Sequence, residues 1–147
     1  MYFLTKTTFF ILYNMLQVEK NANSTLILTL AEKATLETPY YLFVFENDVT
    51  RNTVTFTAQD LTEFNERYNK FLVTETSGTV NYTSGVIELS PTGFWSYKVY
   101  EQEDNTNLDI NNTVGLVEQG KLKVTGLPTT NTTYSNKRTF KPYGKGT

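Results

Sequence analysis

A nine-residue stretch, residues 93–101, constrains the fold of this chain more than any other. It reads Gly-Phe-Trp-Ser-Tyr-Lys-Val-Tyr-Glu and contains the only tryptophan. Side chains alternate between the two faces of a β-strand, so Trp95, Tyr97 and Val99 share one face. That face is bulky and apolar, whereas the other face mixes aromatic, polar and charged side chains. The stretch therefore predicts a sheet with one face packed against a core.

Other segments show the same strand pattern. Residues 25–30 place three leucines on one face, which predicts a strand with one buried side. Residues 40–46 are apolar on both faces, as expected for a central strand. A polar turn of about five residues follows, and residues 53–58 then alternate between apolar residues and threonine. The two segments together predict a β-hairpin.

The spacing of these segments predicts the fold class. Turn residues recur about every eight to twelve positions, which is typical of an all-β chain and favours an immunoglobulin-like antiparallel β-sandwich of about seven to eight strands. Residues 60–69 are the one segment with helical spacing, and they begin like a capping box. We expect a sandwich domain over residues 21–125 with an extended arm at each end. Its predicted core includes Leu28, Leu42, Val44, Phe56, Trp95, Tyr97 and Val99.

The amino-acid composition excludes several classes of function. The 147 residues contain no cysteine and no histidine. Disulfides, thiolate metal sites and the catalytic arrangements built on cysteine or histidine are therefore excluded. Catalysis by carboxylate, lysine or tyrosine side chains remains possible, but the residue types most often used in catalysis are missing. We expect a non-enzymatic protein with no cofactor and no metal.

Residues 1–20 are expected to form an N-terminal arm. The apolar run Phe9–Tyr13 is too short to span a bilayer and short even for a signal-peptide core. Three interpretations of residues 1–14 compete: a poor signal peptide, an extra strand or arm, and a mis-called start with the initiator at Met15. If the segment is made, its β-branched and aromatic residues favour an extended arm. Its candidate partner-binding residues are Phe9, Phe10 and Tyr13.

Residues 126–147 are expected to form a basic, irregular C-terminal arm. The net charge of the chain is −2, but no acidic residue follows Glu118. One interpretation is a solvated, flexible end, and the other is an arm that docks on an acidic surface of a partner. The basic residues are too few for a nucleic-acid role, and no membrane role is expected. The candidate partner-binding residues are Tyr134, Lys137, Arg138, Phe140, Lys141 and Tyr143.

Three other groups of residues suggest a binding or catalytic site, but each also has a purely structural interpretation. One is an aromatic platform for sugar rings, and its candidates are Trp95, Tyr97, Tyr100, Tyr40, Tyr41 and Tyr82. A second is a calcium loop, formed by Asp104, Asp109 and the asparagines Asn105, Asn107, Asn111 and Asn112. The third is a glycosidase pair, either Glu63 with Glu66 or Glu101 with Glu103. In each case core packing or a solvated loop is the favoured interpretation.

Several runs also resemble a known group of proteins. Residues 39–48, 65–71, 93–102 and 115–120 look like segments of small virion proteins of tailed phages that infect Bacteroidetes, including the crAss-like group. The resemblance covers about two thirds of the chain and leaves out both arms. It implies a structural virion component in many copies, such as a capsid accessory or decoration protein or a head-fibre anchor. It also implies other virion proteins, capsid or fibre subunits, as partners and the virion as its location. The alternative is a carbohydrate-binding or adhesin module that uses aromatic residues near Trp95.

Overall fold

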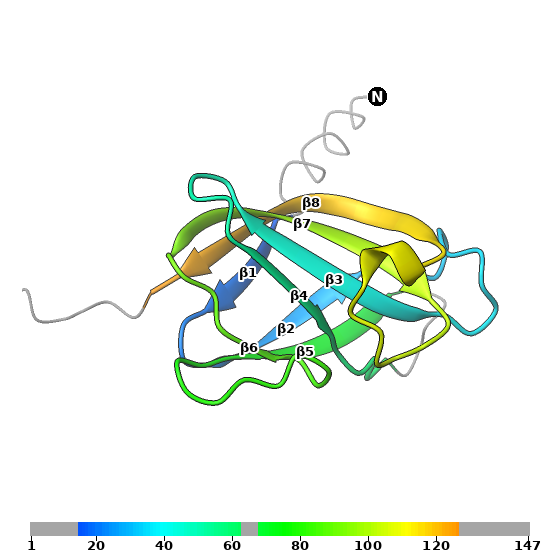
Figure 1. Ribbon diagram of the computed structural model, residues 1–147, viewed down its shortest axis with the longest axis horizontal. Helices are drawn as coiled ribbons and strands as arrows, with labels where there is room; N and C mark the ends of the chain where they lie inside the picture. Colours follow the sequence, from blue (N-terminus) through cyan, green and yellow to red (C-terminus); the bar gives the residue numbers. More distant parts are fainter. Residues whose placement is uncertain (1–14, 63–67, 127–147) are drawn as a thin grey trace, which may run out of the picture.

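The computed structural model describes residues 15–62 and 68–126, which fold into two β-sheets (Figure 1). One 3-10 turn, η1, precedes the last strand, and no α-helix is present in these two ranges. The elements are β1 (Leu16–Glu19), β2 (Asn23–Leu28), β3 (Tyr40–Asn47), β4 (Thr53–Thr57), β5 (Asn69–Glu75), β6 (Val86–Ile87), β7 (Gly93–Gln102), η1 (Ile110–Asn112) and β8 (Gly115–Thr125).

The strand order agrees with the predicted sandwich. The larger sheet has the order β1-β8-β7-β3-β4 and the smaller one β2-β5-β6. The two sheets share one hydrophobic core that draws residues from both of them, as in a β-sandwich. Two pairs correct the expectation of a purely antiparallel fold, since β1 with β8 and β5 with β6 run parallel.

Strand β7 occupies the position that its sequence predicts. It pairs with β3 on one side and β8 on the other, and Trp95, Tyr97 and Val99 are buried on its inner face. The Trp95 indole N–H donates a hydrogen bond of 3.0 Å to the carbonyl of Pro91. The polar end of this large side chain is thereby satisfied inside the fold.

Phenylalanine rings join the two sheets. Phe43 of β3 stacks on Phe56 of β4 at 5.1 Å and meets Phe71 of β5 edge-on at 4.9 Å between ring centroids. Such aromatic pairs add about 0.5–1.5 kcal/mol each beyond the burial of their area. Because Phe71 belongs to the smaller sheet, these contacts hold the two layers together.

All seven residues expected in the core are buried, but they lie on two faces. Leu42 and Val44 alternate with Phe43 and therefore point away from the main core. The loop after β7 folds back in front of β3 and β4, as Figure 1 shows, and the Thr57 hydroxyl donates to the carbonyl of Asn105 in that loop at 3.0 Å. Residues 41–45 are thus buried on both faces of the strand.

Two segments differ from expectation. Residues 16–19, assigned from sequence to the N-terminal arm, form β1, whose Leu16 and Val18 are buried beside β8. Asp60 forms an isolated bridge with Phe71 and Asn69 begins β5, so both ends of the expected helix are extended instead. Residues 63–67 lie outside the described ranges. Burial of alternate side chains favours the extended conformation of β1 and β5.

Gly120 lies where the core leaves no room for a side chain. It is opposite Tyr97 in the β7–β8 ladder, and a Cβ at this position would come within 2.8 Å of the Tyr97 ring. The Tyr97 hydroxyl donates to Glu118 at 2.9 Å, which fixes the ring. Gly115 lies in the same strand, and a Cβ there would meet nothing within 4 Å.

We predict that Gly120→Ala lowers the free energy of unfolding by about 1–3 kcal/mol, because the Tyr97 ring must move. The matched variant Gly115→Ala should change it by less than about 0.5 kcal/mol or stabilise the chain slightly. Urea unfolding followed by tryptophan fluorescence measures both. Equal effects of the two variants would contradict the close packing at Gly120.

A buried carboxylate connects three segments of the sandwich. Glu75 accepts hydrogen bonds from the Lys20 ammonium at 2.7 Å and from the backbone N–H groups of Asn21 at 2.7 Å and Leu89 at 2.9 Å. Burial alone would raise the pKa of Glu75, but these hydrogen bonds outweigh it and hold the pKa below its ordinary value. The ionised form therefore stabilises the fold.

Because the pKa of Glu75 is lower in the folded than in the unfolded chain, its stabilisation is present above the unfolded pKa and is lost as the pH falls through the folded value. We predict that Glu75→Gln costs about 2–4 kcal/mol at pH 7 and reduces the loss of stability below about pH 4.5. Urea titrations between pH 2 and 7 measure this, with the exposed Glu88→Gln as control. If the free energy of unfolding of Glu75→Gln and its dependence on pH both equal those of the wild type, ionised Glu75 does not stabilise the fold.

Candidate functional site

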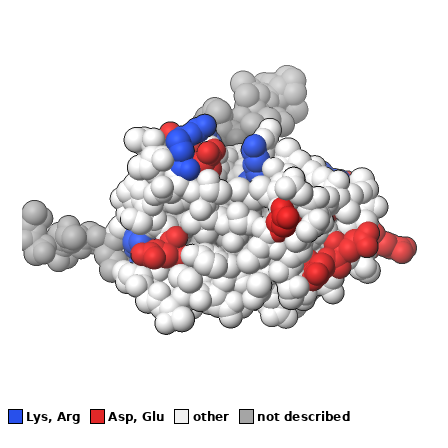
Figure 2. All heavy atoms as spheres, viewed as in Figure 1, with Lys and Arg blue, Asp and Glu red and all other residues white. Residues whose placement is uncertain are grey.

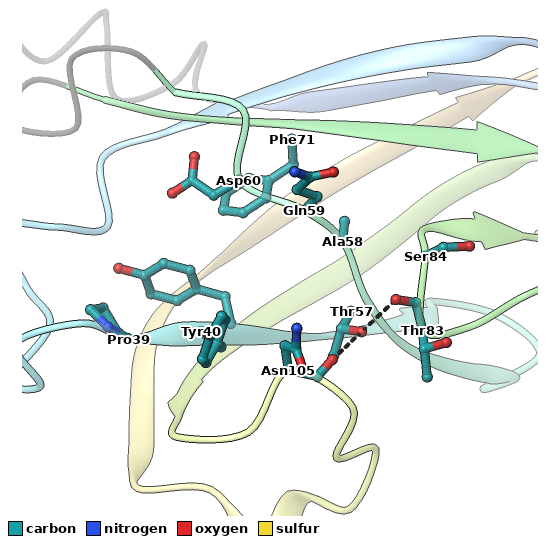
Figure 3. A pocket seen from close by; sticks show the side chains of 11 residues that line it. Pro39, Tyr40, Thr57, Ala58, Gln59, Asp60, Phe71, Thr83, Ser84 and Asn105 are labelled. Carbon is teal, nitrogen blue, oxygen red and sulfur yellow. Dashed lines mark hydrogen bonds between the residues drawn. The ribbon is translucent and has the colours of Figure 1, made fainter.

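Two adjoining hollows lie at the start of β3. Their volumes are about 540 and 320 Å³, and both are lined by Pro39, Tyr40, Tyr41 and Asp60. We call them together the β3 pocket. Figure 3 shows Asp60 and Gln59 across the larger hollow from Tyr40 and Asn105. The larger hollow is also lined by Thr57, Ala58, Phe71, Thr83 and Ser84.

The alternation of β3 places its first two tyrosines differently. Tyr40 is 48% exposed, whereas Tyr41 is only 4% exposed and its ring meets Phe71 edge-on at 5.9 Å. Both side chains nevertheless line the pocket because it lies at the end of the sandwich, where the two layers open. The pocket therefore combines a rigid, buried phenol with an exposed aromatic ring.

The Asp60 carboxylate is held in place by its neighbours. One oxygen, Oδ1, accepts hydrogen bonds from the N–H and hydroxyl of Thr62, and Oδ2 accepts from the Asn69 side-chain amide at 2.8 Å. Asn69 is fixed in turn, because its Oδ1 accepts from the N–H groups of Leu30 and Ala31. This network makes Asp60 a preorganised group on the pocket wall.

The pocket carries negative charge. Among its described lining residues the charged side chains are Asp60 and Glu37, and neither lysine nor arginine is among them. The buried Glu101 accepts three backbone and hydroxyl hydrogen bonds from Thr35 and one from Leu36 nearby. Burial and the charges of Asp60 and Glu101 raise the pKa of Tyr41 to about 12.

A second surface feature lies on the segment from β7 to β8. Leu108, Ile110, Val114 and Leu116 are all exposed, and Leu116 lies opposite the half-buried Tyr100 of β7. The exposed acidic residues of the same segment are Glu103, Asp104 and Asp109. We call these apolar and acidic residues the β7–β8 patch. In Figure 2 acidic side chains gather at the right-hand end of the molecule, where Figure 1 places both this segment and the loop between β2 and β3.

The nine residues predicted to bind partners fall outside the described residues. They are Phe9, Phe10, Tyr13, Tyr134, Lys137, Arg138, Phe140, Lys141 and Tyr143. Their role stays a prediction from sequence.

Burial excludes Trp95 and Tyr97 from an exposed aromatic platform, in agreement with the favoured interpretation that they pack in the core. Trp95 and Tyr97 are almost fully buried, because they face the second sheet. Of the other candidates, Tyr41 is buried while Tyr40 and Tyr82 are exposed. Sequence reasoning missed the β3 pocket because its walls come from five segments that are separated along the chain. The sequence signal that was available is the Pro39-Tyr40-Tyr41 run before a buried strand.

The acidic constellations have structural roles where they are described. Asp104 accepts from the N–H and hydroxyl of Thr106, and Asp109 caps η1 through the N–H of Asn111. No cluster of three or more acidic residues suited to a metal occurs in residues 15–62 and 68–126. Glu101 is buried and accepts hydrogen bonds from the β2–β3 loop, whereas Glu103 is exposed. Glu63 and Glu66 lie outside the described ranges.

Comparisons with known proteins found no match. No protein-family model, curated protein or solved structure matches this chain. Within the described ranges, no helix has the length and apolar character needed to cross a membrane.

Proposed function

We propose that this protein is a non-enzymatic structural component of a particle, in which copies dock on neighbouring subunits through their terminal arms. The observation that carries the proposal is the β7–β8 patch, with exposed Leu108, Ile110, Val114 and Leu116 beside acidic residues. Exposed apolar side chains bordered by polar ones are typical of protein interaction sites.

The charge distribution supports the C-terminal arm as the occupant. Residues 1–126 carry a net charge of −6, and residues 127–147 carry +4 with no acidic residue. Tyr134, Phe140 and Tyr143 alternate with these basic residues. A segment of this composition complements an apolar patch with an acidic rim, because its aromatic rings cover the leucines while its cations meet the carboxylates.

The particle that fits the sequence is a phage virion. The resemblance to small virion proteins of tailed phages of Bacteroidetes supports a capsid accessory or decoration protein, or a head-fibre anchor. Ordering an arm costs conformational entropy on docking. Repetition over many copies in a particle offsets that cost through multivalency.

Reversing the charge of the arm should weaken self-association. We predict that the full chain self-associates at low salt, and that Lys137→Glu with Arg138→Glu and Lys141→Glu raises the dissociation constant at least tenfold. Leu116→Lys should have a similar effect, because it places a cation in the patch. Sedimentation velocity at 50 and 500 mM salt measures both, with the weaker association expected at high salt.

Two further variants make this test specific. Lys70→Glu reverses an exposed charge on β5 and should leave association unchanged. Glu103→Lys, combined with the three charge reversals in the arm, should restore part of the association. The patch then carries a new positive charge that attracts the negatively charged arm. A monomeric wild-type chain under all conditions, or equal loss with Lys70→Glu, would contradict arm docking.

Membership of a virion has its own test. We predict that peptides of this chain occur in purified tailed-phage particles from its source at a copy number comparable to that of the major capsid protein or of a fibre-anchor site. Quantitative peptide mass spectrometry measures this number, and the first N-terminal peptide distinguishes a start at Met1 from one at Met15. Absence from purified particles would overturn the virion assignment.

A further inference from the structure

Strand β8 is paired along most of its length on one side only. On that side β7 pairs with it from Gly115 to Val124. On the other side β1 covers residues 122–125 and no more. In the described part of the chain, no other strand or isolated bridge lies against residues 115–121 on the β1 side. We call residues 115–121 the β8 edge.

The β8 edge offers backbone hydrogen-bonding groups. The Thr125 carbonyl accepts a hydrogen bond of 2.9 Å from the Lys20 N–H on the β1 side. Because the backbone groups of successive strand residues point to alternate sides, those of Lys121 and Gln119 point to the same side as those of Thr125. Both residues are exposed. A sheet edge of this kind is a template for an added strand.

The register of β1 indicates which segment reaches this edge. β1 runs parallel to β8, with Leu16 opposite Leu122. The same register, continued toward the N-terminus, places Asn14 opposite Gly120. No turn is needed to reach this position, because the chain before Leu16 already points along β8. The segment that directly precedes β1 is therefore the natural occupant of the β8 edge.

We infer that residues 12–14 extend β1 along the β8 edge of the same copy. In a parallel ladder a residue bonds to the two neighbours of the residue opposite it. Asn14 then donates its N–H to the Gln119 carbonyl and accepts from the Lys121 N–H, and the Leu12 carbonyl accepts from the Gln119 N–H. The extension ends at Leu12, because the β-bulge in the β7–β8 ladder interrupts the alternation of β8 beyond this point.

The composition of the segment suits this role. Residues 7–18 contain no charged residue, glycine or proline. Their aromatic and β-branched side chains fit the surface of a pleated sheet. Alternation places Leu12 on the same face as the buried Leu16 and Val18. An apolar segment and an open sheet edge each favour aggregation when unpaired, so their pairing protects both.

The same copy is the favoured source of the added strand. Residues 12–14 are attached to β1, which is already paired with β8 of its own domain. Their local concentration at this edge therefore exceeds that of the same segment from a neighbouring copy. The inference does not depend on the proposed docking between subunits, because residues 1–11 and the C-terminal arm lie outside the pairing.

Amide hydrogen exchange, followed by NMR in 500 mM salt, tests the pairing while docking of the basic arm is screened. We expect the Gln119 and Lys121 amides to exchange at least tenfold more slowly in the full chain than in a chain that starts at Met15. The Gly120 amide points to β7, so its two rates should agree within about threefold. Equal rates for Gln119 and Lys121 in the two chains, or an equal change at all three amides, would overturn the inference.

Two proline variants of the full chain test the register. Asn14→Pro removes the N–H that donates to the Gln119 carbonyl, so the Gln119 and Lys121 amides should exchange about as fast as in the shorter chain. In Tyr13→Pro the lost N–H points away from β8, so both rates should stay within about threefold of the wild type. Equal effects of the two prolines would overturn the register.

Cross-linking identifies the copy that supplies the strand. The chain has no cysteine, so Tyr13→Cys with Gln119→Cys introduces a single thiol pair, at positions that lie opposite each other in the inferred register. A short bis-maleimide should link this pair within one chain, at least tenfold more than the control pair Tyr13→Cys with Lys70→Cys. Linked dimers as the main product, or equal yields for the two pairs, would overturn the assignment to the same copy.

Discussion

The fold depends on burying the inner row of β7. Trp95, Tyr97 and Val99 face the core, and Glu101 continues the same row to the end of the strand. Because β7 pairs with both β3 and β8, it aligns the larger sheet on either side of this row. Burial of one large aromatic side chain contributes about 2–3 kcal/mol, so the row supplies a substantial part of a net stability of about 5–15 kcal/mol. The Phe43, Phe56 and Phe71 rings then attach the second sheet.

The same row ends beside the candidate sites. A buried carboxylate needs hydrogen bonds in place of those to water. For Glu101 the backbone N–H groups of Thr35 and Leu36 in the β2–β3 loop donate them. That loop runs into Pro39 and Tyr40, which form one wall of the β3 pocket. The chain after β7 contributes Asn105 to the pocket and Leu108 to the patch. Pocket and patch therefore share one acidic end of the sandwich.

Alternation and turn spacing were enough to predict the all-β sandwich and its buried residues, because a period of two is a local property of the chain. They predicted Trp95 in the core and residues 40–46 as a central strand for this reason. The parallel pairing of β1 with β8 was not predictable, since it joins residues about 100 positions apart. The extended conformation at Asp60 and Asn69 also depends on a tertiary contact, the bridge from Asp60 to Phe71.

The candidate sites show the same limit. Tyr40, Asp60 and Asn105 are unremarkable in the sequence, and only the packing of two sheets brings them to one pocket. At Trp95 residue type alone suggested a binding platform, but the strand pattern favoured the core, and the side chain is buried there. Residue type thus indicates chemistry, whereas burial decides whether that chemistry is accessible.

Zero-length cross-linking on a mixture of unlabelled and ¹⁵N-labelled full chains tests the docking of the arm most directly. A carbodiimide joins lysine amines to carboxylates in contact, and the isotope pattern separates links within one chain from links between chains. The account predicts mixed-isotope links from Lys137, Lys141 or Lys145 to Glu103, Asp104 or Asp109. Links confined to one chain, or mixed links that fall mainly on distant carboxylates such as Glu88, would contradict it.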